Sequence, residues 1–136
     1  MIFVDSIRTN ESFIKEAYSP DEFASITVIK GDEAIRLGGE QAKNGIVYIF
    51  TKDYARTKYW NFFSGISAPF AKAVNSPADV DVIYILNDKI LTEKTEAELF
   101  LITKDNLLDI HVIEREQLKK QFGKKGRVGV ILRTRN

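Results

Sequence analysis

The stretch Gly38–Lys52, "GGEQAKNGIVYIFTK", separates two interpretations of this chain. Glycines beside an apolar strand are compatible with a loop that binds phosphate. Such a loop lies between the end of a strand and the start of a helix, where amide groups and the helix dipole attract an anion. The predicted order here is helix, glycines, strand, so the helix presents its carbonyl end, which repels anions. We therefore interpret the stretch as a left-handed helix C-cap at Gly39 and an Asn44-Gly45 turn into a strand.

Short strands and helices alternate around this stretch. Strands are expected at 2–4, 26–30, 46–51 and 79–86, and helices at 11–18 and 32–38. Asn10 is a suitable N-cap for the first helix, and Ser19-Pro20 ends it. The aromatic-rich residues 54–77 are expected to form two helices that are separated at Ser64-Gly65, with Ser67 capping the second.

The opening stretch recurs after 84 residues. Residues 26–49 align without a gap with residues 110–133, and Gly39 and Gly45 fall on Gly123 and Gly129. Chance can supply the aliphatic matches, because strands commonly use such residues, but it is less able to supply both glycines at one spacing. Upstream, "FVDSIRT" resembles "YILNDKILT" at a slightly different offset. We interpret the chain as a tandem duplication in which each copy reads β-α-β-α-β.

The predicted fold class is α+β. We expect a first repeat at 1–52, an aromatic helical connector at 53–79, and a more divergent second repeat at 80–136. Each repeat offers about three strands, which is few for independent stability. The two repeats are therefore expected to pack as one unit.

The repeat pattern also carries a family resemblance. It consists of a strand ending in Lys, a small helix containing Ala, then Gly, Asn-Gly, and a Val/Ile strand closed by Thr-Lys. The chain is similar in this to the plug domain of TonB-dependent outer-membrane receptors, in the form common in Bacteroidetes-type envelope proteins. The second copy matches less well, because it lacks the Asn and ends in Thr134-Arg135. The matching residues of the first copy are Val28, Lys30, Ala34, Gly39, Asn44, Gly45, Ile46, Thr51 and Lys52.

The resemblance implies a plug-like module used apart from a barrel, since 136 residues are too few for the many strands of a receptor barrel. It implies a non-catalytic protein-interaction domain of the bacterial cell envelope, with another envelope protein as partner. The implied location is the periplasm or cell envelope, and the cytoplasm is the alternative. The start "MIFVDSIRTN" lacks signal-peptide features, so an exported protein would have lost its signal from this chain.

The composition excludes or disfavours several kinds of site and partner. The chain has no cysteine, which excludes thiol catalysis, zinc–thiolate sites and disulfides. Its net charge of +1 does not favour nucleic acid as a partner. No apolar run approaches the roughly 18 residues that a transmembrane helix needs. We expect no cofactor and no metal.

Catalytic candidates are few. His111 is the sole histidine and alternates with apolar neighbours in a predicted strand, and Asp109 is expected to face away from it. Asp32-Glu33 lies in the first turn of a predicted helix and Glu114/Glu116 precedes another, so helix-start electrostatics explains both carboxylate pairs. We expect no enzyme. A hydrolase using acidic residues and His111 is the less favoured alternative, and a small-molecule-binding sensory domain would need an apolar pocket of ~300 Å³ or more near the connector.

Two groups of residues are candidate partner surfaces. The adjacent aromatic residues of the connector cannot all face one core from a single helix, so they either contribute to both repeats or form a patch for a partner or homodimer. The C-terminal bases could bind an anionic surface, or simply form the solvated face of a helix. The aromatic group is Trp60, Phe62 and Phe63, and the basic group is Lys119, Lys120, Lys124, Lys125 and Arg127, with Arg133 and Arg135 beyond it.

Overall fold

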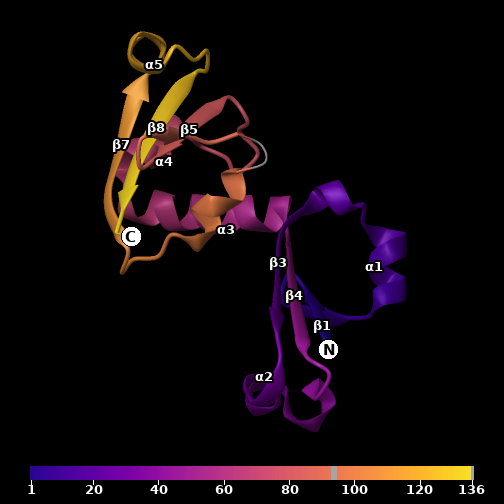
Figure 1. Cartoon of the computed structure of the whole chain (residues 1–136). Coiled ribbons are helices and arrows are strands. Elements are labelled where there is room, and N and C mark those ends of the chain that lie inside the picture. Colours follow the sequence, from indigo (N-terminus) through magenta and orange to yellow (C-terminus); the bar gives the residue numbers. More distant parts are fainter. Residues whose placement is uncertain (93–94, 136) are drawn as a thin grey trace. The chain divides into compact units, whose positions relative to one another are not determined.

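The structure is a computed structural model that describes residues 1–92 and 95–135. The chain divides into two compact units, Met1–Ala55 and Arg56–Asn136 (Figure 1). Each unit contains a four-stranded mixed sheet with helices, so the α+β fold class and the two similar units are confirmed. The structure gives two units where the sequence predicted one, and each has a sheet and a hydrophobic cluster of its own.

The first unit has strand order β2-β1-β4-β3, with β1 and β4 parallel and the other neighbours antiparallel. The expectation of three strands per repeat is wrong, because the hairpin after β1 supplies a short fourth strand. Its elements are β1 Ile2–Val4, β2 Ile7–Thr9, α1 Glu11–Ala17, η1 Pro20–Glu22, β3 Phe23–Ile29, α2 Gly31–Gly38, η2 Gly39–Ala42 and β4 Ile46–Thr51.

The second unit has the corresponding strand order β6-β5-β8-β7. Helix α3 (Lys52–Ile66) contains the boundary between the units, and it is followed by α4 (Ala68–Ala73). A 3₁₀ helix stands between the hairpin and the third strand, where the sequence predicted an α-helix by analogy with the first repeat. The remaining elements are β5 Val82–Leu86, β6 Lys89–Ile90, η3 Glu96–Leu101, β7 Leu107–Glu114, α5 Arg115–Phe122 and β8 Val128–Thr134.

The helical connector differs from its prediction at one point. Helix α3 continues through Ser64-Gly65 and ends at Ile66. The second helix begins after Ser67, whose side chain accepts a hydrogen bond from the Phe70 amide, as the capping prediction required. One glycine costs a helix only about 1 kcal/mol, so packing of the surrounding aromatic residues is sufficient to carry α3 past it.

Strand pairing defines how the two units correspond. Val4 pairs with Ile49, and Leu86 pairs with Leu132, so β1 matches β5 at an offset of 82 and β4 matches β8 at 83. The third strands, β3 and β7, match at the predicted offset of 84, since Ile26 lies opposite Ile49 as Ile110 lies opposite Leu132.

One predicted correspondence is therefore wrong by a residue. Gly129 is the counterpart of Ile46, because Ile113 pairs with Gly129 as Ile29 pairs with Ile46, and the first of these pairs is one residue closer in sequence. Gly45 has φ of 104° and an added Cβ would lie 3.1 Å from the Ile29 carbonyl oxygen, so it serves the first connection only. The predicted correspondence of the other two glycines, Gly39 and Gly123, agrees with the structure. Gly39 and Gly123 both end a helix with positive φ, 71° and 66°, although only Gly123 adopts the full left-handed conformation.

The same side-chain arrangement joins the hairpin turn to the end of the neighbouring parallel strand in both units. The Asp5 carboxylate accepts hydrogen bonds from the Thr51 amide and hydroxyl, each at 2.8 Å. In the second unit the Asn87 amide oxygen accepts from the Thr134 amide at 2.9 Å, and the Asn87 amide group donates to the Thr134 hydroxyl at 2.9 Å. We call this arrangement the Asx–Thr clasp. Asp5 and Asn87 each have φ of 50°, a conformation that Asp and Asn tolerate in two-residue hairpin turns.

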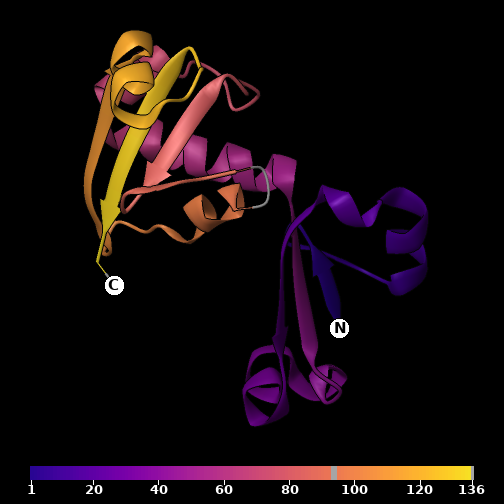
Figure 2. The same ribbon diagram turned by 45° about the horizontal axis from the view of Figure 1, so that its top comes forward.

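Helices α2 and α5 cover one face of their respective sheets, and Figure 2 shows α5 in front of the second sheet while α3 passes behind it. Beneath the two helices, a small residue in one unit stands where the other unit has a large one, and the reverse. Ala34 and Ile46 in the first unit correspond to Leu118 and Gly129 in the second. An added Cβ at Gly129 would lie 3.0 Å from Leu118 and 2.8 Å from Ile113. In both units the space between helix and sheet is thus filled, although the residues that fill it differ.

The Asx–Thr clasp can be tested at Asp5. Asp5→Ala removes both acceptors and places alanine at positive φ, so we expect a loss of about 1–3 kcal/mol in local stability. Asp5→Asn should stay within about 0.5 kcal/mol of the parent, since Asn87 makes the equivalent bonds. Hydrogen exchange of the Thr51 amide measures the effect, and the Thr134 amide is the internal control. Equal protection of Thr51 in both variants would contradict a stabilising clasp.

The close packing at Gly129 gives a second prediction. Gly129→Ala should destabilise the second unit by about 1–3 kcal/mol through overpacking against Ile113 and Leu118. Gly65→Ala is the matched control, because nothing lies near its added Cβ within α3, and it should stabilise by about 0.5–1 kcal/mol. Urea unfolding followed by fluorescence of Trp60, the sole tryptophan, reports on this unit. A neutral Gly129→Ala would show that the sheet can shift to make room.

Candidate interaction surface

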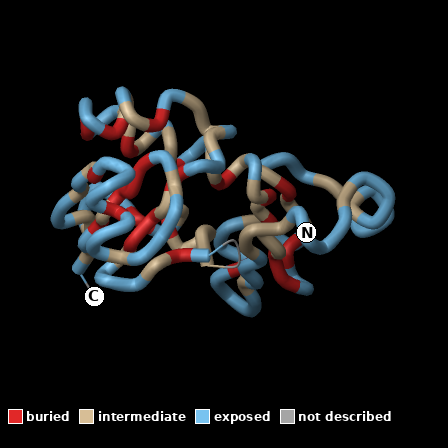
Figure 3. The backbone as a smooth tube through the Cα atoms, turned by 90° about the horizontal axis from the view of Figure 1, so that it is seen from above, coloured by how far each residue is buried: buried red, intermediate tan, exposed pale blue. Residues whose placement is uncertain are grey.

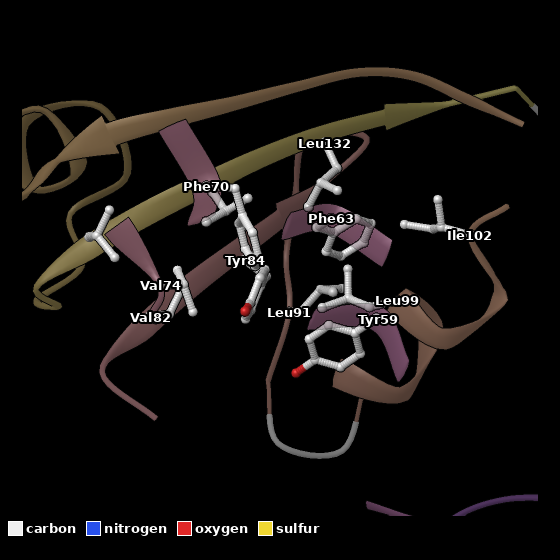
Figure 4. Close-up of a cluster of buried hydrophobic side chains, with 12 residues drawn as sticks. Tyr59, Phe63, Phe70, Val74, Val82, Tyr84, Leu91, Leu99, Ile102 and Leu132 are labelled. Atoms are coloured by element: carbon white, nitrogen blue, oxygen red, sulfur yellow. The ribbon is translucent and has the colours of Figure 1, made fainter. Parts of the chain in front are cut away.

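One face of the second sheet is covered by the connector. Figure 4 shows Tyr59 and Phe63 of α3, with Phe70 and Val74 from and just after α4, packed with Tyr84 and Leu132 of the sheet. Leu99 and Ile102 close the same cluster from η3 and the residue after it. These side chains form the largest hydrophobic cluster of the second unit.

The predicted aromatic patch is therefore wrong in part. Phe63 is completely buried and cannot form an accessible surface. Trp60 and Phe62 are half-buried against the same cluster, and the Trp60 indole donates a 2.7 Å hydrogen bond to the Val74 carbonyl. The sequence left open whether the connector supplies both cores; the hydrophobic cluster that these residues join belongs to the second unit. The ring of Tyr59 contacts Tyr84 of the sheet and the ring of Phe63 contacts Phe70 of α4, so aromatic residues of α3 pack against both elements.

The corresponding face of the first sheet is also apolar. We call it the first-sheet apolar face. Cross-strand pairing and the two-residue period of strands place its side chains on one side of the sheet. It consists of Ile2, Val4, Ile7, Ile26, Val28, Val47 and Ile49.

The two ends of this face are open to solvent. Ile26 and Val28 on β3 are 58% and 52% exposed, and Ile7 on β2 is 71% exposed. In the middle of the sheet Val4 and Ile49 are buried. Sequence alternation had placed Ile26 and Val28 on one side of a strand, but a buried core face has the same alternation, so exposure could not be inferred.

His111 and Asp109 lie closer than predicted. The His111 Nε2 atom is 2.8 Å from an Asp109 carboxylate oxygen, because residues two apart in a strand point to the same side. The prediction that Asp109 faces away is wrong. The His111 side chain is 67% exposed on β7, an edge strand of its sheet. The four other acidic candidates lie at helix starts: Asp32 and Glu33 in the first turn of α2, Glu114 at the N-cap of α5, and Glu116 in its first turn.

The basic residues converge only in part. Arg115, Lys119, Lys124 and Lys125 line a hollow of about 360 Å³, together with Asp81 and Gly126. Arg127 instead forms an ion pair with Asp79, and Lys120 is exposed on α5. The hollow combines four positive side chains, which suits an anion, although all four belong to a solvent-exposed surface.

A larger hollow of about 650 Å³ lies in the second unit beside a polar cluster. Its lining includes Arg56, Tyr84 and Glu96, with apolar residues of β5 and β6. The Tyr59 hydroxyl donates to Glu96 at 2.6 Å, and Arg56 pairs with Glu96 at 3.1 Å. Burial, then the neighbouring Tyr84 and the bond to Glu96, raise the pKa of Tyr59 above its ordinary value of 10.0. Burial likewise raises the pKa of Tyr84.

Across residues 1–92 and 95–135, no group of three or more His, Asp or Glu side chains is placed to hold a metal ion. Among the helices of that same part of the chain, none combines the length and apolar character that crossing a membrane requires.

Comparison of the chain with protein-family models, with curated proteins and with solved structures returned no match.

The tyrosine pair predicts how the second unit responds to alkaline pH. A raised folded-state pKa means that the stabilisation is fully present below pH ~10, where unfolded tyrosine begins to ionise, and is lost as pH rises. Tyr59→Phe removes one such group, so its free energy of unfolding should fall less steeply above pH ~10, by up to about 1.4 kcal/mol per pH unit. Urea unfolding by Trp60 fluorescence between pH 8 and 11 measures the slopes. Parallel curves for parent and variant would contradict the assignment.

Proposed function

We propose that this chain is a non-catalytic protein-docking module of a bacterial cell envelope, built from two plug-like units. The observation that carries the proposal is the first-sheet apolar face, on which Ile26 and Val28 are more than half exposed. Single exposed aliphatic residues are ordinary on protein surfaces. Here two follow each other on one side of β3, so their exposed parts are contiguous, and the half-buried Val47 lies opposite Val28 on the neighbouring strand.

The energetics favour covering this face with another polypeptide. Full burial of an isoleucine or valine side chain contributes about 1.5–3 kcal/mol, so burying the exposed parts of Ile26 and Val28 would stabilise a complex without any charged contact. The envelope location and the comparison with receptor plugs rest on the motif of residues 26–52. The docking role rests on the exposed face and would hold in another compartment.

A small-molecule-binding role is the second candidate, and the hollow of about 650 Å³ favours it. The hollow exceeds the ~300 Å³ that such a site needs, and it has apolar walls beside Arg56 and Glu96. Both charges already pair with each other, and Tyr59 occupies the second oxygen of Glu96. Internal pairing of this kind satisfies the polar groups without a ligand, which makes docking the better-supported proposal.

Site-specific photo-crosslinking tests the docking role. A photo-reactive phenylalanine analogue is placed at Val28 or, as the control, at Thr27, which is exposed on the opposite side of the same strand. In cells that produce the full chain, we expect a light-dependent adduct from position 28 that is absent from position 27. Adding Ile26→Lys to the Val28 form should abolish the adduct, because it places a charge in the docking face.

Equal adducts from both positions would indicate random collisions, and no adduct from either would contradict docking at this face. An adduct whose mass is twice that of the chain would identify a second copy as the partner. Ligand-dependent change in Trp60 fluorescence without a position-28 adduct would favour the small-molecule role.

A further inference from the structure

We propose that the first-sheet apolar face binds a basic, aromatic-bearing amphipathic α-helix, in the way that α3 and α4 cover the corresponding face of the second sheet. The proposal deepens the docking function above and rests on it. It names the occupant, a helix packed on the exposed β3 side of the face, which the docking function alone does not specify.

The third strands of the two units carry matching apolar residues. At the offsets set by strand pairing, Ile26 and Val28 of β3 correspond to Ile110 and Val112 of β7, so the two third strands carry identical residues at these positions. Val47 corresponds in the same way to Val130. The two faces thus share these three residues, whereas Ile2, Val4, Ile7 and Ile49 correspond to Tyr84, Leu86, Lys89 and Leu132.

What covers the two faces differs. Ile110 and Val112 are half-buried and pack against the cluster that includes Tyr59 and Phe63 of α3. Ile26 and Val28 are more than half exposed. The same side chains on the same framework are therefore covered by an aromatic helix in one unit and open to solvent in the other.

The connection between the second and third strands also differs. In the second unit this connection places Leu99 and Ile102 in the covered cluster. In the first unit it contains α1, in which no residue is buried (Figure 3), and Phe13 is 51% exposed. Ile14 and Tyr18 of this connection are half-buried, and Tyr18 contacts Phe23 of β3. Val4 and Ile49 in the middle of the face are buried, so the part left uncovered next to them is the β3 side, formed by Ile26 and Val28.

Charge complements the apolar match. The connection at 10–22 carries four acids and one base, and the first unit as a whole carries nine acids and six bases. The segment 52–75, which contains α3 and α4, carries four bases and one acid. A helix of that composition would bring aromatic side chains to the sheet and positive charge to an acidic unit, which favours association and its rate.

A partner could also bind the first unit as an extended strand instead of a helix. Strand β3 is an edge strand, and an extended peptide could pair with its free backbone groups. Such pairing would leave the side chains of Ile26 and Val28 exposed, because they project from the face and not from the edge. Burial of both side chains is the property that a helix on the face explains and an added strand does not.

Nuclear magnetic resonance of the full chain tests the proposal with a defined probe, a synthetic peptide of residues 52–75. We expect the peptide to shift the signals of Ile26, Val28 and Val47 and to leave the exposed Thr27 side chain unchanged. A peptide with Tyr59→Ala and Phe63→Ala should bind at least about tenfold more weakly, since it lacks the apolar anchors.

Matched variants of the chain complete the test. Ile26→Thr with Val28→Thr keeps strand-compatible residues and should weaken peptide binding at least about tenfold, whereas Thr27→Ser should leave it unchanged. Unchanged protection of the Thr51 amide would confirm that the double variant still folds.

The outcomes separate the two proposals. Signal shifts confined to Ile110 and Val112 would mean exchange with the resident helix, and no shifts would mean no helix site; either result overturns the proposal. Shifts confined to the β3 backbone would indicate strand pairing and would also overturn it. A position-28 adduct without peptide binding would leave docking standing and the helix refuted, and loss of both would refute both. Self-association of the peptide-free chain that the double variant abolishes would replace the helix with a second copy.

Discussion

The Asx–Thr clasp is the interaction on which each unit depends. It joins the hairpin turn after the first strand to the end of a parallel strand more than 40 residues later, Asp5 to Thr51 and Asn87 to Thr134. Parallel neighbours have no tight turn to set their register, so the apolar pattern and long-range contacts such as this clasp hold it. A slip of one residue would turn every apolar side chain to the opposite face. By holding the register, the clasp determines which side chains form each face of the sheet.

Because the register is the same in both units, the faces of the two sheets can be compared residue by residue. The face beneath α2 and α5 is filled in both, although Ala34 and Ile46 in one become Leu118 and Gly129 in the other. The opposite face is filled by aromatic residues in the second unit and remains partly exposed in the first. Duplication has thus produced one framework with two surfaces of different use. The second sheet packs against helices of its own unit, and the first keeps Ile26 and Val28 exposed, where we propose docking.

Local signals were sufficient for much of the architecture. Asn10 and Ser67 cap the helices that they were predicted to cap, because an N-cap depends on one side chain and an amide three residues away. Errors occurred where packing or pairing decides. Gly65 did not break α3, Gly129 pairs one residue away from its sequence match, and Asp109 lies against His111. The exposure of the first-sheet apolar face could not be predicted, since the same alternation of Ile26 and Val28 describes a buried strand and an exposed one.

The sequence by itself determined the α+β class, the duplication, the caps and the absence of thiol chemistry, because these depend on composition and on neighbours within a few residues. The tertiary structure alone decided the register of the parallel strands, the burial of Phe63, and the exposure of the first-sheet apolar face. Burial depends on which distant segment lies over a sheet, and helices α3 and α4 cover Ile110 and Val112 while no residue of α1 is buried. Identical residues at the two positions therefore differ in exposure, because different segments pack against them.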